Sequence, residues 1–401
     1  MENKVTAFLF VPDQAASQTV VYGLTVLERS LHALERGGVE RVFLPAAAQA
    51  FLGKKADWKL DIQFSDDFQQ AFSTVENGAI VMTEPLVIDP KCIQQILAES
   101  GQSTSILTTS SGEIGWYPKS ALTAIAKEQW PNLEQALTLA KQQVLQTKIL
   151  DFQGLICATV HNEQEKKAVM KALFRSLTKP TDGWVSRNLN RPVSTLFSRV
   201  LAHTSITPNQ FTIVTGLIGL SVAWFLAKGG YWNYLIGGAL FHFTSVLDGV
   251  DGELARLKFK SSPFGQWLDT VVDNTSYLAA LGGIITGLFL NGAPQYVIWA
   301  GILSVIFAVA ALGSLYFYLL RFKSGGTLLN VKYGFQDGNS NFDKIFQVAA
   351  AFGKRDLFAL IFFILGIFGV MQWALIYIAI MAFMVFVFSI QAHISASKNK
   401  A

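Results

Sequence analysis

Residues 248–273 read DGVDGELARLKFKSSPFGQWLDTVVD and place four aspartates in two pairs. Asp248 and Asp251 are three residues apart, and Asp269 and Asp273 are four apart, so each pair shares one face of a helix. Apolar segments flank the stretch, and ionisable residues at membrane depth usually face a bundle interior and serve function. We therefore expect two helices that meet across a short turn and present these carboxylates to one or two divalent cations, Mg²⁺ or Mn²⁺, because hard oxygen ligands select hard ions.

The 401-residue chain combines a mean hydropathy of +0.36 with only 15% charged residues, which is too apolar for a soluble protein of this length. Its N-terminal part nevertheless reads as water-soluble sequence, so the chain should consist of two unlike parts. Most of the apolar segments that follow approach the ~20 residues that span hydrocarbon. They predict an all-α six-helix transmembrane bundle over residues 207–395 and a polar tail at 396–401, with spans at 211–227, 231–247, 267–290, 297–320, 357–371 and 373–394.

Lysine and arginine gather on one side of the predicted spans. They occur before the first span and after the second, fourth and sixth, whereas the opposite side has only Lys228. The positive-inside rule then places both termini and the aspartate motif on the cytoplasmic side of a cell inner or plasma membrane. Because the basic residues form short loop clusters and not a patch interleaved with aromatics, no nucleic-acid partner is expected.

Residues 179–206 connect the two parts. Apolar side chains such as Leu189, Val193 and Val200 recur there at helical spacing against polar ones. This pattern predicts an amphipathic helix that lies in the cytoplasmic membrane interface. Pro208 is tolerated in the first turn of the span that follows.

The N-terminal part, residues 1–178, alternates short apolar runs with stretches of helical periodicity. Such a pattern predicts a cytoplasmic α/β layered domain. The strand candidates are 5–11, 41–44, 79–82 and 105–108, and the helix candidates are 26–36, 133–145 and 162–177.

The motif Asp248-x-x-Asp251-Gly252-x-x-Ala255-Arg256, eight residues, Gly265-x-x-x-Asp269-x-x-x-Asp273 resembles the signature of the CDP-alcohol phosphotransferases at every fixed position. Residues 194–210, which include Thr207-Pro208-Asn209, resemble the interfacial helix and first-span entry of members related to inositol-phosphate transferases. The resemblance covers the chain from about residue 182. It implies an integral membrane enzyme of phospholipid or phosphodiester-polyol synthesis, which moves a phosphoalcohol group from a CDP-alcohol to an acceptor hydroxyl and releases CMP.

The resemblance also assigns roles to single residues. The four aspartates would hold the metal, and the last of them, Asp273, would accept the hydroxyl proton of the acceptor as the catalytic base. Donor binding would fall to Asn209, Gly252, Ala255, Arg256 and Gly265. Basic residues that border the later spans are candidates for binding a phosphorylated acceptor, although positive-inside topology explains them equally well: Arg321, Lys323, Lys354 and Arg355. We also expect a homodimer formed through the membrane domain and in contact with membrane lipids.

The donor stays open between CDP-diacylglycerol and a polar CDP-alcohol such as CDP-inositol. Two other classes of function compete with the enzyme. A membrane cation transporter would also bury carboxylates, but it would more often distribute them over broken helices or internal repeats, which the sequence does not show. A non-catalytic anchor for the N-terminal domain would have no reason to keep four intramembrane acids.

Residues 24–44 and 79–90 resemble the sugar-phosphate nucleotidyltransferases, which in some members precede the membrane enzyme and make its CDP-alcohol. Active nucleotidyltransferases have a glycine-rich loop with cations after the first strand, and this loop cradles the triphosphate. The corresponding residues 12–19 read PDQAASQT, without glycine or cation, and Glu84 stands where a metal-binding aspartate would follow a central strand. We therefore expect an inactive domain. A bifunctional enzyme whose N-terminal domain makes the donor is the alternative.

Overall fold

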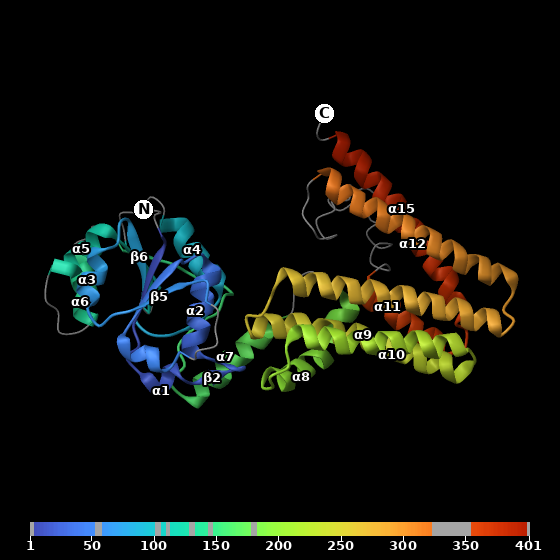
Figure 1. Ribbon diagram of the computed structural model, residues 1–401, viewed down its shortest axis with the longest axis horizontal. Helices are drawn as coiled ribbons and strands as arrows, with labels where there is room; N and C mark the ends of the chain where they lie inside the picture. Colours follow the sequence, from blue (N-terminus) through green and yellow to red (C-terminus); the bar gives the residue numbers. More distant parts are fainter. Residues whose placement is uncertain are drawn as a thin grey trace. The chain divides into compact units, whose positions relative to one another are not determined.

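The fold is taken from a computed structural model of the chain (Figure 1). It describes residues 4–52, 58–100, 106–109, 113–127, 133–142, 147–177, 183–322 and 354–398. The chain divides into two compact units, residues 1–177 and 178–401. We call them the α/β unit and the helical unit.

A seven-stranded sheet forms the centre of the α/β unit, with strand order β10-β8-β9-β6-β1-β4-β5. Neighbouring strands are parallel, except that β9 runs antiparallel to both β6 and β8. The strands are β1 (Thr6–Leu9), β4 (Arg41–Leu44), β5 (Asp61–Phe64), β6 (Gly78–Met82), β8 (Ile106–Thr108), β9 (Ile114–Pro118) and β10 (Thr147–Ile149). Two small antiparallel sheets pair β2 (Val20–Val21) with β3 (Leu24–Thr25), and β7 (Val87–Ile88) with β11 (Cys157–Ala158). The predicted α/β layered domain is confirmed.

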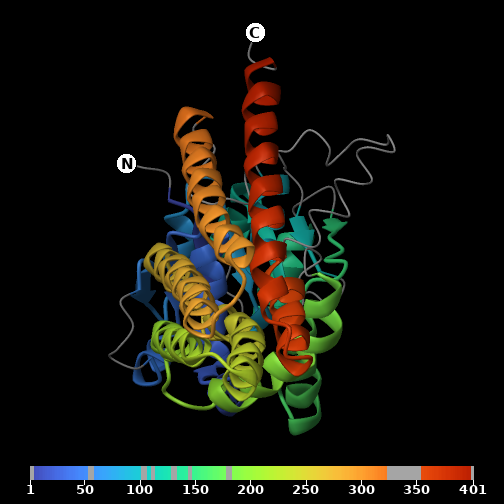
Figure 2. The same cartoon turned by 90° about the vertical axis from the view of Figure 1, so that its right-hand side faces the viewer.

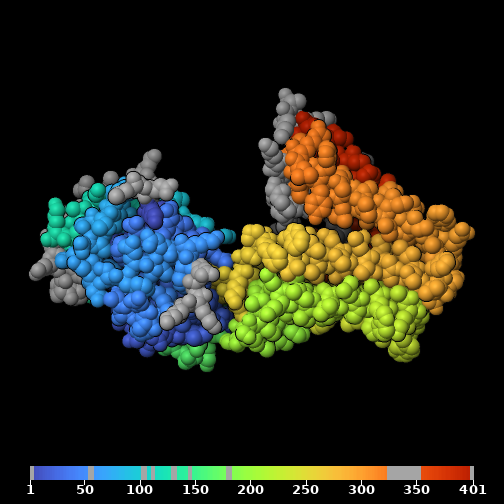
Figure 3. Space-filling view, in the orientation of Figure 1, coloured from blue at the N-terminus to red at the C-terminus, as the bar shows by residue number. Residues whose placement is uncertain are grey.

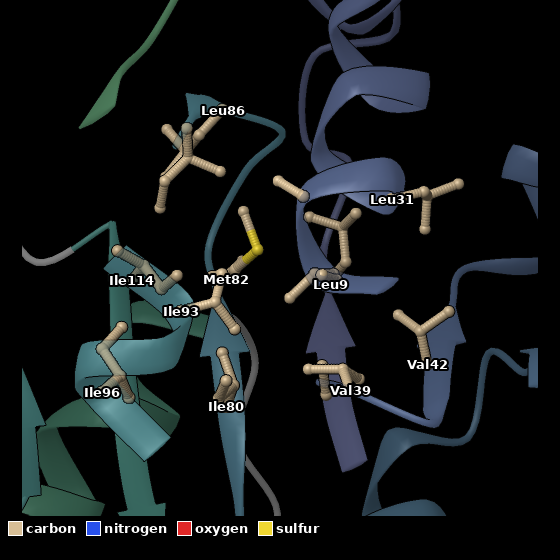
Figure 4. Close-up of a cluster of buried hydrophobic side chains, with 14 of the residues drawn as sticks. Leu9, Leu31, Val39, Val42, Ile80, Met82, Leu86, Ile93, Ile96 and Ile114 are labelled. Carbon is tan, nitrogen blue, oxygen red and sulfur yellow. The ribbon is translucent and has the colours of Figure 1, made fainter. Parts of the chain in front are cut away.

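Helices cover both faces of this sheet, as side chains that alternate along β1 show. Leu9 packs into one core with residues of α2 (Val26–Gly37) and α4 (Pro90–Ser100). Phe8 points the other way, into a second core. In Figure 4, Leu9 and Met82 of the sheet lie against Leu31 of α2 and Ile93 of α4. The second core is built with α3 (Phe68–Ser73), α5 (Lys119–Lys127) and α6 (Leu133–Gln142). The other helical elements among the described residues of this unit are α1 (Gln14–Ser17), η1 (Ala46–Ala50) and α7 (Glu163–Arg175).

Local sequence explains where α2 begins and ends. The Thr25 hydroxyl accepts a hydrogen bond from the backbone N–H of Glu28 at 3.1 Å, and the Glu28 carboxylate accepts one from the N–H of Thr25 at 2.7 Å. This capping box satisfies two N–H groups that the first turn leaves without helical partners. At the other end, Gly38 has a φ of +103°, a conformation that glycine adopts without steric cost. The predicted helix over 26–36 is therefore confirmed with both of its ends.

The described part of the helical unit contains η2 (Ser186–Asn190), α8 (Arg191–Ala202), α9 (Pro208–Lys228), α10 (Tyr231–Leu257), α11 (Pro263–Leu290), α12 (Gln295–Phe322), α14 (Arg355–Ile367) and α15 (Gln372–Lys398). Helix α9 packs on both α10 and α11, and the three appear as adjoining green and yellow layers in the space-filling view (Figure 3). Helices α12 and α15 form a second packed pair, seen side by side in orange and red in Figure 2. A helical C-terminal part is thus confirmed.

Three helices of the described chain, α9, α12 and α15, are long and apolar enough to cross a membrane by length and composition. Helices α10 and α11, of 27 and 28 residues, carry the charged motif at one end, and α14 has 13 residues. Each of the six predicted spans therefore has a helix in its place. The number of helices that cross a membrane stays a prediction.

Helix α9 approaches α11 closely because small residues line their contact. A Cβ atom added at Gly283 would lie 2.5 Å from the carbonyl oxygen of Ala223, which no real side chain could occupy. Small residues allow such backbone contact between apolar helices, where dispersion replaces the hydrophobic driving force. This packing fixes the helix that carries Asp269 and Asp273 against α9.

Helix α8 docks on α10 through polar side chains. Ser194 and Ser198 are buried on that side, whereas Leu196 and Val200 are 60% and 63% exposed on the other. The ammonium of Lys258, just after α10, donates hydrogen bonds to one carbonyl oxygen in the last turn of α8, that of Leu201 (3.1 Å), and to two beyond it, those of Thr204 (2.7 Å) and Ile206 (2.9 Å). The predicted amphipathic helix is present. Its position in a membrane interface stays a prediction.

Candidate active site

The aspartate motif lies where α10 ends and α11 begins. Helix α10 ends at Leu257, and a short loop leads to Pro263, the first residue of α11. The Ser262 hydroxyl caps the new helix by accepting a hydrogen bond from the N–H of Gly265 at 3.0 Å. Serine followed by proline is a strong helix start, so the sequence places the turn between the two aspartate pairs.

Three of the four aspartates converge. Asp248, Asp269 and Asp273 each offer one carboxylate oxygen, and these oxygens all lie within 4.8 Å of one another. The Arg355 guanidinium at the start of α14 forms ion pairs with Asp248 at 2.5 Å and with Asp273 at 2.7 Å. It also lies 5.1 Å from the centroid of the Tyr277 ring, which gives it an aromatic face to stack on. The cluster therefore draws on three helices.

Asp251, the fourth aspartate, lies beside this cluster. Its carboxylate accepts a hydrogen bond from the hydroxyl of Thr212 on α9 at 2.6 Å. A hydrogen bond to a charged acceptor is short and strong, so Thr212 fixes the direction of this carboxylate. A threonine in an apolar helix does not by itself indicate a partner, so the sequence offered no signal for the contact of Thr212 with Asp251.

Two cavities adjoin the aspartates. The first, here called the Asn209 cavity, measures about 220 Å³ and lies between α9, α10 and α11. The second, the Arg355 cavity, measures about 420 Å³ and extends toward η2, α8 and the start of α14. Their walls share Asp251, Gly252, Arg256 and Asp269. A molecule in one cavity would thus meet a molecule in the other at the motif itself.

All five residues predicted for donor binding line the Asn209 cavity: Asn209, Gly252, Ala255, Arg256 and Gly265. A Cβ atom at Gly265 would lie 2.9 Å from the side-chain oxygen of Asn209, so the glycine leaves room for that amide. Gly265 therefore allows a close approach between the start of α11 and Asn209 of α9. Arg256 lies near Gly252, where a Cβ would come within 3.7 Å of its guanidinium.

The residues predicted for acceptor binding separate in the structure. Lys354 and Arg355 line the Arg355 cavity. Arg321 lies at the end of α12, where its guanidinium is 5.4 Å from the centroid of the Phe322 ring. It is not among the residues that line the two cavities. Lys323 lies outside the described residues.

The carboxylate oxygens of the aspartate cluster suit a divalent cation. Three carboxylates bring hard oxygen atoms within 4.8 Å, and their side chains are only partly buried, so an ion would have an entry path. Among the residues that the structure describes, this is the only such group of three or more histidine, cysteine, aspartate or glutamate side chains. The predicted four-ligand set is represented by these three, with Asp251 beside them.

The α/β unit has no comparable convergence in its described part. Residues 14–17 correspond in position to the phosphate-binding loop of active nucleotidyltransferases. They form the short helix α1, which Asp13 caps. Glu84, which follows β6, pairs with the His161 ring at 3.1 Å. Burial raises the pKa of Glu84 above its ordinary value, and the charge of His161 opposes this rise.

Residues 205–386, which include α9 to α11 and the whole aspartate motif, match the family model of the CDP-alcohol phosphatidyltransferases. The chain carries a CDP-alcohol phosphatidyltransferase domain. The match begins just before α9 and contains both cavities' shared wall, so the transferase domain and the site coincide in sequence.

Several curated relatives resemble part of the chain. A "Bifunctional IPC transferase and DIPP synthase" from Aquifex aeolicus is 41% identical over 122 residues, which are 30% of this chain and 27% of the relative. A protein of the same description from Thermococcus kodakarensis is 39% identical over 132 residues, 32% of this chain and 29% of the relative. An "Archaetidylinositol phosphate synthase" from Pyrococcus horikoshii is 38% identical over 91 residues, 22% and 46% of the two chains. The matches thus span less than half the length of these relatives.

Proposed function

We propose that this chain is an integral membrane CDP-alcohol phosphotransferase, which transfers a phosphoalcohol group from a CDP-alcohol to an acceptor hydroxyl and releases CMP. The observation that carries the proposal is the shared wall of two cavities at a carboxylate cluster. The Asn209 cavity contains every residue expected to bind the donor, and the Arg355 cavity contains two basic residues expected to bind an acceptor. A transfer between two molecules needs this juxtaposition, because reacting atoms have to be held in contact.

The reaction places each group at a definite position. The acceptor oxygen in the Arg355 cavity attacks the phosphorus that bears the alcohol. A new P–O bond forms there, and the P–O bond to the CMP phosphate breaks, so CMP leaves into the Asn209 cavity. The Asp273 carboxylate takes the hydroxyl proton, and it is held at 2.7 Å from the guanidinium of Arg355, which lines the Arg355 cavity. Arg256, which lines both cavities, is positioned to contact the diphosphate.

A divalent cation held by Asp248, Asp269 and Asp273 would neutralise the negative charge of the diphosphate. The chain's own contribution is orientation. Thr212 fixes Asp251 at the shared wall, and Arg355 ties α14 to both motif helices through Asp248 and Asp273. We infer that Mg²⁺ or Mn²⁺ serves as the ion.

One further cavity bears on the class of donor. It measures about 310 Å³, and apolar side chains of five helices line it, among them Phe241, Leu281, Leu315 and Phe362. Tyr277, one helical turn beyond Asp273, is part of its wall and also stacks on Arg355. An apolar cavity about twice the size of one that holds benzene suits a hydrocarbon chain. This favours CDP-diacylglycerol over a polar donor such as CDP-inositol.

The test is a donor and acceptor screen with the purified full-length chain in lipid nanodiscs and Mg²⁺ or Mn²⁺. CDP-diacylglycerol and CDP-inositol are offered with inositol, inositol 1-phosphate or glycerol 3-phosphate, and CMP release is measured. We expect release that depends on donor, acceptor and metal together. If no pair releases CMP while reconstituted vesicles take up Mg²⁺ or Mn²⁺, the transporter reading replaces the enzyme.

Two secondary proposals accompany the function. We propose that both termini and the aspartate cluster face the cytoplasm, and labelling of single cysteines introduced near Lys228 and near the C-terminus measures the side. We also propose a homodimer through the membrane domain, and the mass of the protein in nanodiscs measures this. The bifunctional alternative predicts that the α/β unit makes the donor from CTP, which a pyrophosphate assay detects.

A further inference from the structure

A fully buried carboxylate lies two residues after Asp251 and outside the cluster of aspartates. Glu253 of α10 is 0% exposed, and side chains of α8 satisfy both of its oxygens. Arg191 pairs with one oxygen, which also accepts a hydrogen bond from the Ser194 hydroxyl at 2.9 Å. The other oxygen accepts one from the Ser198 hydroxyl at 2.6 Å. An ionised carboxylate is costly to bury, so the pairing with Arg191 is what makes this position tolerable.

The backbone of α10 makes room for this arginine. Gly249 lies four residues before Glu253 and therefore on the same face of the helix. A Cβ atom at Gly249 would lie 3.0 Å from the Arg191 guanidinium and 3.5 Å from the Glu253 carboxylate. Any side chain there would press on the ion pair. The glycine and the glutamate thus act on the same guanidinium.

Arg191 is also part of the wall of the Arg355 cavity, together with Lys354 and Arg355. Its side chain is 11% exposed, so it reaches the cavity from an otherwise buried position. Arg355 is engaged by Asp248 and Asp273, whereas Arg191 is held by a carboxylate outside that cluster. A guanidinium has a rigid fork of five N–H donors that matches phosphate geometry.

We propose that Arg191 binds the phosphate of a phosphorylated acceptor in the Arg355 cavity, and that Glu253 and Gly249 position its guanidinium for this. That the phosphate belongs to the acceptor of a transfer reaction rests on the proposed function. The phosphate site itself is defined by the cavity and its cations. A pair needed for stability alone would not have to end at a cavity wall, because apolar side chains often replace such pairs without loss of stability.

The experiment measures binding without turnover. The full chain in phosphatidylcholine nanodiscs is titrated calorimetrically with inositol 1-phosphate, with unphosphorylated inositol as the matched probe and CMP as a probe of the donor side. Arg191→Gln should weaken inositol 1-phosphate binding by about tenfold or more, the loss of one charged hydrogen-bonding partner. CMP affinity should stay within about twofold. Arg199→Gln, on the same helix and outside the cavity lining, is the control and should bind like the wild type.

Positioning is tested with two further variants. Glu253→Gln keeps the size of the side chain and removes its charge, and Gly249→Ala keeps the carboxylate and crowds the guanidinium. Both should weaken inositol 1-phosphate binding, and the Arg191→Gln/Glu253→Gln double variant should bind no more weakly than Arg191→Gln. Thermal unfolding of each variant separates this loss from a loss of fold. Gly249→Ala preserves all the charges, so it remains informative if Glu253→Gln does not fold.

The outcomes separate the inference from the proposed function. Wild-type affinity for inositol 1-phosphate in Arg191→Gln overturns the phosphate site, as does a wild-type protein that binds inositol as well as its phosphate. Wild-type affinity in both Glu253→Gln and Gly249→Ala overturns the positioning role. A protein that binds inositol 1-phosphate through Arg191 but releases no CMP with any donor retains the site and loses the proposed reaction.

Discussion

The two units of the chain hold their charged side chains in opposite ways. In the helical unit, Asp248, Asp269 and Asp273 converge within 4.8 Å, and Arg355 pairs with Asp248 and Asp273. In the α/β unit, Glu84 pairs with the ring of His161 at 3.1 Å and is not part of a group of carboxylates among the described residues. A packed α/β core does not depend on a phosphate cradle, because burial of apolar surface holds it together. Clustered carboxylates among apolar helices oppose folding, so their presence calls for a ligand.

The largest effect that could break this comparison is the removal of one clustered carboxylate. Asp269→Asn or Asp248→Asn should lower CMP release by about a thousandfold or more, because each removes a ligand that stabilises the transition state. Rates are measured with the donor and acceptor found in the screen, at saturating Mg²⁺. Glu163→Gln, at an exposed position of α7, is the control and should keep the wild-type rate. Turnover close to normal in either aspartate variant would remove the metal site from the proposal.

A second change sharpens the roles within the cluster. Asp273→Asn should lower CMP release by about a hundredfold or more, while donor affinity by calorimetry changes only a few-fold, because a base acts in the chemical step and not in binding. Asp251→Asn should lose both CMP release and donor binding, since Asp251 lines both cavities and its carboxylate is held by a hydrogen bond from Thr212. Equal losses of donor binding in the two variants would mean that Asp273 serves as a ligand only.

A much smaller effect is expected at the acid of the α/β unit. Because burial raises the pKa of Glu84 above 4.5, the folded state holds its proton more tightly than the unfolded state does. The free energy of unfolding should therefore fall as pH rises from about 4.5 through the folded pKa. Glu84→Gln should remove this slope, by a few tenths of a kcal/mol, as is typical of partly exposed groups. Native-state hydrogen exchange of the β1 and β6 amides at pH 5 and pH 7 measures it, and an opposite slope would contradict it.

The last prediction is that the isolated α/β unit shows no activity with CTP. A chain that ends at Leu177 should fold, because both hydrophobic cores of the α/β unit lie within residues 1–177. It should release no pyrophosphate from CTP with inositol 1-phosphate or glycerol 3-phosphate, because residues 12–19 contain neither glycine nor cation. Circular dichroism checks the fold and a coupled pyrophosphate assay checks the activity. Pyrophosphate release above a matched blank would mean that the α/β unit is active and that the chain is bifunctional.

Local patterns in the sequence predicted much of this structure. The start of α2 at Val26, the strand at 41–44 and the helix pair around the aspartates follow from capping, alternation and spacing within a few residues. Such signals are local, and they survive folding because the tertiary structure agrees with them. The residues that line the Asn209 cavity could also be predicted to lie together, since most of them belong to the same motif.

Contacts across long sequence separations could not be predicted. Arg355 lies 82 residues after Asp273, and only the packing of α14 brings the two together. Glu253 reads as one more charge near the end of a helix, and nothing in its neighbours signals that α8 buries it completely. Strand β9 was not among the predicted strands, and its antiparallel direction is set by its pairing with β6 and β8 and not by composition.

The contacts that η2 and α8 make with α10 and with Lys258 just after it have a consequence for how the chain is made. Asn190 contacts Ser245, Ser198 contacts Glu253 and Leu201 contacts Lys258, over separations of 55, 55 and 57 positions. At a synthesis rate of roughly 5–20 residues per second, α8 leaves the ribosome about 3 to 11 s before its partner. During that interval the residues that its serines and Asn190 contact, Ser245 and Glu253, have not yet been made. Helix α8 is therefore synthesised before the residues that pair with its polar face, and a ribosome that pauses before residue 245 would leave that face without these partners.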